Sequence, residues 1–145
     1  MTKSIALGCD HVGLFLKSPI KKYLEESGHQ VFDIGTNTQA SVDYPVFAVE
    51  VCNLIKSSKC ETAILFCGTG VGMSIAANKI KGIRAVVCSE PYSAKMAREH
   101  NNANVLALGS RVIGIELSKT IVDAWLVAKF EGGRHSRRVD MFDQD

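Results

Sequence analysis

A cysteine followed by alternating glycines is the part of this sequence best suited to chemistry. Cys67 ends an apolar run, and Gly68, Gly70 and Gly72 follow it before a helix-forming segment expected over residues 74–79. A strand, a glycine turn and a helix start together direct backbone N–H groups at an anion. A thiol that faces a helix N-terminus has its thiolate favoured, so Cys67 could act as a nucleophile or a general base.

Cys67 could also have no chemical role, because a cysteine at a strand end is commonly a small buried side chain. Against this, no Asp or Glu occurs between Glu61 and Glu90, so Cys67 is the obvious base within the loop. The glycine spacing differs from the Gly-x-Gly-x-x-Gly of dinucleotide folds, and Met73 and Ser74 replace the Lys and Ser/Thr of a Walker loop. We therefore expect an anion or oxyanion here, with a dinucleotide-dependent enzyme as a weak alternative.

Short apolar strands alternating with helices must position this loop. The expected strands are residues 4–9, 30–34, 63–67, 84–88 and 105–109. The expected helices begin near Gly13, Asp43, Ser74, Ser89 and Ile115. This alternation predicts parallel βαβ units and an α/β fold, a three-layer α/β/α sandwich around a five-stranded parallel Rossmann-like sheet. We expect one domain over residues 1–130 and a glycine-led, basic C-terminal arm over residues 131–145.

Some helix details can be predicted as well. Pro19 should kink the first helix or occupy an early-turn position in it. Asp43 should cap the second helix, which places Pro45 in its first turn and runs to about Ser57. That helix should bury four apolar side chains, namely Phe47, Val51, Leu54 and Ile55. The last helix should extend from Ile115 to Phe130.

Ligands of an open parallel sheet bind beyond the carboxyl ends of its strands. Besides Cys67, the polar residues that directly follow expected strands are Asp10, His11, Ser89, Ser110 and Arg111. Tyr44 begins a helix, and His100 ends one and is expected near the same rim. The basic side chains that could form a phosphate cradle are His11, Arg111, Arg134, His135, Arg137 and Arg138. The alternative for the last four is a solvated basic end.

Composition limits the classes of function. A net charge of +2 over 145 residues is too small to imply nucleic-acid binding. There is no run of about 18 apolar residues, so we expect no membrane span, and the N-terminus does not resemble a signal peptide. Five cysteines without a CxxC pair indicate a reducing, cytoplasmic setting rather than disulfides or a zinc site, and no metal is expected.

Seven segments in this order resemble the ribose-5-phosphate isomerase type B family, which also contains galactose-6-phosphate and allose-6-phosphate isomerases. The segments are Gly8–His11, Asp43–Pro45, Cys67–Gly72, Gly82–Ala85, His100–Asn101, Gly109–Arg111 and Gly132–Arg138. The resemblance implies a metal-free and cofactor-free aldose–ketose isomerase of the pentose phosphate pathway. It would interconvert D-ribose 5-phosphate and D-ribulose 5-phosphate through a cis-enediolate.

The resemblance also implies roles for individual residues. Cys67 would be the base that moves a proton between C1 and C2, and His100 would open the furanose ring with help from Asp10 and Tyr44. The backbone of Gly68, Thr69, Gly70, Val71 and Gly72, with the Thr69 hydroxyl, would stabilise the oxyanion. Asn101 would hold substrate hydroxyls. The phosphate would be held by His11, Arg111, Arg134, His135 and Arg138.

Members of the family that lack the cysteine carry a glutamate in the glycine loop, where this chain has Met73. The resemblance further implies a homodimer or a dimer of dimers with shared active sites, in which the arm completes a neighbour's phosphate site. A lone chain should then be inactive. Two alternatives stay open: a hexose-6-phosphate (allose or galactose) isomerase, and a sugar-phosphate-binding module without activity.

Overall fold

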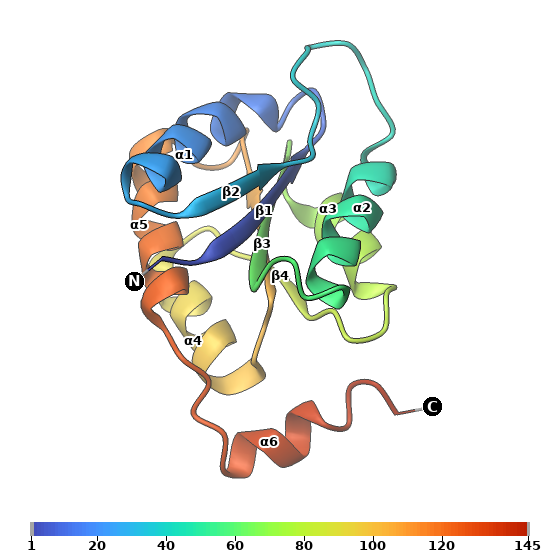
Figure 1. Cartoon of the computed structure of the whole chain (residues 1–145), viewed down its shortest axis with the longest axis vertical. Helices are drawn as coiled ribbons and strands as arrows, with labels where there is room; N and C mark the ends of the chain where they lie inside the picture. Colours follow the sequence, from blue (N-terminus) through green and yellow to red (C-terminus); the bar gives the residue numbers. More distant parts are fainter. Residues whose placement is uncertain (1, 145) are drawn as a thin grey trace.

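Five parallel strands form one sheet at the centre of the molecule, in the order β2-β1-β3-β5-β4 (Figure 1). The computed structural model describes residues 2–144. The strands are β1 (Ser4–Cys9), β2 (Gln30–Asp33), β3 (Thr62–Cys67), β4 (Ala85–Val87) and β5 (Val105–Gly109). The middle position of the sheet thus belongs to β3, the strand that ends in the predicted base.

Helices cover both faces of this sheet. They are α1 (Leu14–Glu26), α2 (Tyr44–Lys56), α3 (Val71–Asn78), α4 (Pro91–Asn101), α5 (Ile115–Val127) and α6 (Arg134–Val139). One face carries α1, α4 and α5, and the opposite face carries α2 and α3 (Figure 1). The predicted α/β/α sandwich with a five-stranded parallel sheet is confirmed.

The alternation of side chains along β3 explains why this strand is fixed so firmly. Ile64 and Phe66 point into the apolar cluster shared with α1, α4 and α5, whereas Ala63, Leu65 and Cys67 point toward α2 and α3. Every residue of β3 is buried. A fully buried Leu, Ile or Phe side chain stabilises the fold by about 1.5–3 kcal/mol. The core therefore holds the carboxyl end of β3 in place from both sides.

The chain leaves the two central neighbours, β1 and β3, toward opposite faces. After β1 it passes to α1, and after β3 it passes to α3 on the other face (Figure 1). Adjacent strands whose connections diverge in this way leave a crevice between their carboxyl ends, where α/β proteins bind ligands. Asp10 and Cys67 flank this crevice.

Several boundaries differ from the expected ones. Helix α3 begins at Val71 rather than Ser74, because the turn closes at Gly70, which adopts a left-handed φ of +82°. Helix α5 ends at Val127 rather than Phe130, since Ala128 is already extended. Helix α6 lies inside the predicted arm and was not expected. The strand ends agree with the prediction to within one residue.

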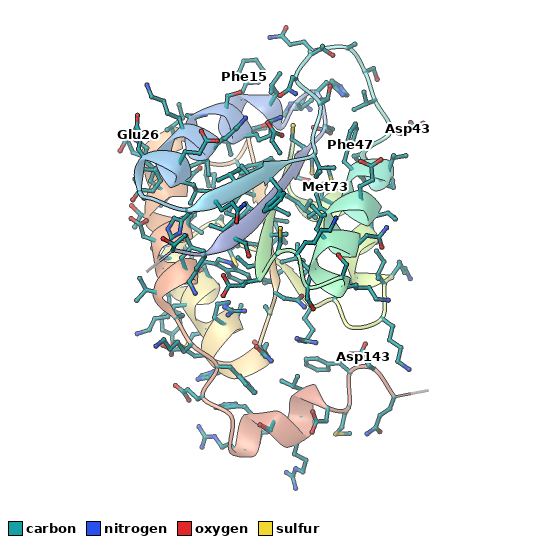
Figure 2. The ribbon with its side chains drawn as sticks, in the orientation of Figure 1. Phe15, Glu26, Asp43, Phe47, Met73 and Asp143 are labelled. Atoms are coloured by element: carbon teal, nitrogen blue, oxygen red, sulfur yellow. The ribbon has the colours of Figure 1, made fainter. Side chains whose placement is uncertain are left out.

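The details of the helices were predicted in part. Pro19 lies inside α1, in its second turn, and the helix continues through it. Asp43 occupies the N-cap position of α2 but makes no capping hydrogen bond. Val51 is buried as expected, whereas Phe47, Leu54 and Ile55 are only partly buried against the α2–α3 side of the core. Figure 2 labels Phe47 near the start of α2, close to the carboxyl edge of the sheet.

Within residues 2–144, no helix is both long and apolar enough to cross a membrane.

Candidate active site

The thiol of Cys67 lies against the N-terminus of α3. Its Sγ accepts a hydrogen bond from the amide of Gly70 at an N···S distance of 3.1 Å, and the side chain is only 5% exposed. The left-handed conformation of Gly70, which glycine adopts without steric cost, turns this amide toward the sulfur. The sulfur therefore faces both a donated N–H and the N-terminal end of the helix.

Other thiols of the chain are in environments that keep them protonated. Burial raises the pKa of Cys9, Cys52 and Cys88 to about 11 in each case. Burial also raises the pKa of Cys60. These groups are therefore neutral near pH 7, and all five cysteines are free thiols. Cys67 differs from them in receiving a backbone N–H on its sulfur.

Thr69 and Tyr44 contact the first turn of α3. The Thr69 hydroxyl accepts a hydrogen bond from the amide of Val71 at 3.2 Å, so it caps the first turn of α3. Tyr44, at the start of α2, crosses directly over Gly72, where an added Cβ would lie 2.7 Å from the ring carbon Cζ. The absence of a side chain at position 72 is thus what lets the tyrosine reach the glycine loop.

Asp10 stands across the crevice from this loop. Its amide donates to the carbonyl of Phe66 at 3.2 Å, which ties the end of β1 to the end of β3. Its carboxylate oxygen Oδ1 accepts from the amides of Val12 at 3.0 Å and Gly13 at 2.7 Å. The side chain is 7% exposed. Asp10 therefore holds the turn into α1 at the edge of the crevice.

His11 and Arg111 line one cavity of about 270 Å³ at the carboxyl edge. The amide of Arg111 donates to the carbonyl of Gly68 at 2.9 Å, and the amide of Ser110 donates to the carbonyl of Cys67 at 2.9 Å. The cavity is thereby fixed to the glycine loop. An imidazole and a guanidinium together suit a phosphate group. A larger cavity of about 490 Å³, at the amino edge beside Lys3, contains none of the predicted site residues.

The loop between β2 and α2 borders this cavity and is anchored by Lys17. The ammonium of this fully buried lysine donates to Asp33 Oδ1 at 2.9 Å, to the carbonyl of Thr36 at 2.8 Å and to Asn37 Oδ1 at 2.8 Å. Farther along the same loop, the amide of Val42 donates to Nδ1 of His11 at 3.4 Å. A neutral His11 then carries its proton on Nε2. Lys17 thus positions the loop that orients His11.

Replacing Lys17 with methionine should lower the free energy of unfolding by about 3 kcal/mol, because the Asp33 carboxylate, only 13% exposed, loses its buried partner. Affinity for inorganic phosphate should fall as well, since the loop no longer holds His11. Urea denaturation and a phosphate titration measure the two effects. Lys21→Met is the matched control: Lys21 contacts the same carboxylate at 3.3 Å but is 38% exposed, so a change below about 1 kcal/mol is expected. Equal losses in the two variants would contradict the anchoring role.

His100, Asn101 and the basic tail lie at the opposite edge of the sheet. In a βαβ fold each helix runs antiparallel to the strands, so the C-terminus of α4 lies at their amino ends. The chain indeed continues directly from α4 to Asn104, whose amide donates to the carbonyl of Arg84, the residue before β4. Figure 1 shows α6 at this end of the molecule. The expectation that His100 shares a rim with Cys67 is therefore wrong within one chain.

One tail residue, His135, packs against His100. The two rings stack with a centroid distance of 4.3 Å and an interplanar angle of 11°. His135 is buried, while Arg134 and Arg138 are exposed on α6. One chain therefore holds two separate groups of predicted residues. The first is Asp10, His11, Tyr44, the glycine loop with Cys67, and Arg111; the second is His100, Asn101, Arg134, His135 and Arg138.

The comparison with known proteins decides what kind of protein carries these groups. A model of the family described as "Ribose/Galactose Isomerase" matches residues 5–142. The chain belongs to this family. It is therefore an isomerase, as the resemblance predicted.

The similarity to known relatives and solved structures extends over nearly the whole chain. The chain is 58% identical to ribose-5-phosphate isomerase B of Escherichia coli, over 95% of this chain and 93% of the relative. It is 48% identical to a D-erythrulose-4-phosphate isomerase of Pectobacterium atrosepticum, over 94% and 91%. The crystal structure of a ribose 5-phosphate isomerase from Thermotoga maritima superposes with a TM-score of 0.96 at 49% identity, covering 97% of both chains.

Two residues that matter for the site were not predicted from the sequence, namely Lys17 and Glu131. Lys17 reads as one of several surface charges on an amphipathic helix, and nothing in its spacing shows that four loop and strand oxygens surround it. Glu131 lies 3.5 Å from Nε2 of His135 and 4.0 Å from Nε2 of His100. Its spacing of four from His135 is the signal that could have indicated the pair.

Proposed function

We propose that this chain interconverts D-ribose 5-phosphate and D-ribulose 5-phosphate. The observation that carries the proposal is the thiol of Cys67, which accepts the Gly70 amide at the crevice between β1 and β3. Family membership and the similarity to ribose-5-phosphate isomerase B of Escherichia coli support this choice of substrate.

The proton transfer begins with the open-chain aldose. The thiolate of Cys67 removes the proton from C2, the C2–H electrons form a C1=C2 double bond, and the carbonyl electrons move onto O1. The resulting cis-enediolate is stabilised by the amides of Gly68–Gly72 and by the Thr69 hydroxyl, which act as an oxyanion hole. The hydroxyl proton on O2 passes to O1, and Cys67 then returns its proton to C1 while the C2 oxygen becomes the ketone. C1 is reduced and C2 is oxidised within one molecule, so no redox cofactor is consumed.

Ring opening precedes this transfer, since the furanose has no free carbonyl. In the proposal, His100 protonates the ring oxygen, with Asp10 and Tyr44 assisting, and Asn101 holds substrate hydroxyls. His100 comes from a second copy of the chain. The support for this is geometric: within one chain His100 lies at the amino edge of the sheet and Cys67 at the carboxyl edge.

The phosphate is held from both copies in the same way. His11 and Arg111 of one chain line the cavity beside Gly68. The arm of the other, residues 131–145, brings Arg134, His135 and Arg138, while residues 1–130 form the domain. Apolar side chains left exposed on α2 and α3 support association, namely Val46, Val49, Val71 and Ile75, at 44–55% exposure. We infer a homodimer or a dimer of dimers in a reducing, cytoplasmic setting.

A related activity on another sugar phosphate is the second candidate. The observation that favours it is the 48% identity to a relative named D-erythrulose-4-phosphate isomerase. A pocket that binds phosphate and an open-chain polyol can accept a chain of different length. Allose 6-phosphate and galactose 6-phosphate are the hexose candidates.

The test is direct. The protein, treated with a chelator, is incubated with ribose 5-phosphate, and ribulose 5-phosphate is followed together with loss of deuterium from substrate labelled at C2. Parallel reactions contain erythrose 4-phosphate, allose 6-phosphate and galactose 6-phosphate. We expect the highest kcat/KM on ribose 5-phosphate. Binding of sugar phosphates without exchange at C2 would identify a non-catalytic module instead.

A further inference from the structure

Three potential metal ligands meet at the amino edge of the sheet: His100 at the end of α4, Glu131 before α6, and His135 in α6. One ligand atom from each lies within 4.8 Å of the others. The carboxylate oxygen Oε2 of Glu131 is common to two of the contacts, at 3.5 Å from His135 Nε2 and 4.0 Å from His100 Nε2. Two imidazoles and one carboxylate form a ligand set that binds zinc and leaves a fourth position open.

The separations are close to those of a tetrahedral site. Ligand atoms at zinc–nitrogen and zinc–oxygen distances of about 2.0–2.1 Å lie about 3.3–3.4 Å apart. The Glu131–His135 pair already has nearly this spacing, whereas the Glu131–His100 pair has to close by about 0.6 Å. Glu131 is 51% exposed and His100 is 38% exposed, so both side chains have room to move.

The ring stack decides which residue must move. The planes of His100 and His135 are only 11° apart, so their in-plane lone pairs do not converge on a single point. One ring must turn about its Cβ–Cγ bond before both can bind one ion. His135 is 9% exposed and held inside the cluster, so the ring that turns is that of His100. Metal binding therefore breaks the stack and occupies a nitrogen of His100.

We propose that His100, Glu131 and His135 bind a divalent transition cation of the zinc type, and that this cation inhibits the enzyme. The inhibitory part rests on the proposed function, because it requires His100 to be the ring-opening acid. A bound cation withdraws this acid and also occupies a nitrogen of His135 that the phosphate would need. Substrate and cation should therefore compete for the same two histidines.

Calorimetric titration of the chelator-treated protein with zinc chloride tests the site independently of activity. We expect one ion per chain in the wild type. Glu131→Gln, which keeps the size of the side chain and removes its charge, should weaken binding at least about tenfold. Glu99→Gln is the matched control, since Glu99 lies on α4 next to His100 but outside the ligand set, and its titration should equal that of the wild type. Equal zinc affinity in the wild type and Glu131→Gln would overturn the site.

Cobalt(II) distinguishes this site from one built on a cysteine. A cobalt–thiolate bond gives an intense charge-transfer band in the near ultraviolet, and imidazole and carboxylate ligands do not. We expect visible d–d bands without the thiolate band, and its presence would overturn the proposal.

Activity supplies the remaining test. Zinc should inhibit turnover of ribose 5-phosphate competitively, and the turnover of Glu131→Gln, compared with its own zinc-free rate, should resist inhibition. Zinc binding that depends on Glu131 without any inhibition would refute the inhibitory role. A protein that binds zinc in this way but never isomerises ribose 5-phosphate would refute the proposed function and leave the metal site standing.

Discussion

Replacing Cys67 with alanine should lower kcat for ribose 5-phosphate isomerisation by about 10²–10⁴-fold, the usual contribution of a positioned general base. The reason is that the loop itself has no carboxylate to take over the proton, since no Asp or Glu occurs between Glu61 and Glu90. The Asp10 carboxylate across the crevice already accepts the amides of Val12 and Gly13. Phosphate binding should change little, because His11 and Arg111 line a cavity whose walls do not include Cys67. Steady-state kinetics and a phosphate titration measure the two quantities.

Cys52→Ala is the matched control for this experiment. Its thiol is fully buried in α2 and burial raises its pKa to about 11, so it cannot supply a thiolate near neutral pH. Its removal should leave kcat unchanged. Cys67→Ser adds a second comparison, since the hydroxyl keeps a hydrogen-bond acceptor for Gly70 but is a far weaker acid than a thiol. Normal turnover in Cys67→Ala would refute the assignment of the base.

The sequence predicted the centre of the fold well because its signal there is strong. The run that ends at Cys67 is apolar at every position, which is typical of a strand covered on both faces, and β3 is buried along its whole length. The glycines that follow indicated a turn. The start of α3 was placed three residues late, because nothing in the sequence shows that Gly70 takes the left-handed conformation and Val71 already the helical one.

The arm was predicted by composition alone. Its six-residue helix α6 is too short to give a helical period, and its position depends on contacts made by the chain after folding. His135 stacks on His100, and the amide of Glu131 donates to the carbonyl of Glu99 at 3.0 Å. Neither pairing is encoded by spacing, since 32 positions separate Glu99 from Glu131 and 35 separate His100 from His135.

The error about His100 had a simpler cause. Residues that follow strands and residues that end helices were placed at one rim, although helices and strands of a parallel sheet run in opposite directions. The placement of Tyr44 is not affected, because Tyr44 begins its helix and so lies at the carboxyl edge over Gly72. The direction of the chain is therefore enough to separate His100, at the end of a helix, from Cys67, at the end of a strand.

Because His100 and Cys67 lie apart within one chain, a mixture of two inactive variants should recover activity. Cys67→Ala lacks the base, and His100→Ala lacks the ring-opening acid, so each alone should show little steady-state turnover. Unfolding an equimolar mixture in urea and refolding it redistributes the chains among dimers. In a mixed dimer with two-fold symmetry, one active site combines the intact Cys67 of one chain with the intact His100 of the other, and the second site lacks both.

Random pairing makes half of the dimers mixed, and half of their sites are intact, so the refolded mixture should recover about a quarter of the wild-type specific activity. The individually refolded variants are the controls, and size-exclusion chromatography establishes that each still associates. If Cys67 and His100 acted within one chain, every site in a mixed dimer would carry one substitution and no activity would return. Recovery therefore requires a site shared between chains, and its absence in properly associated mixed dimers would refute that arrangement.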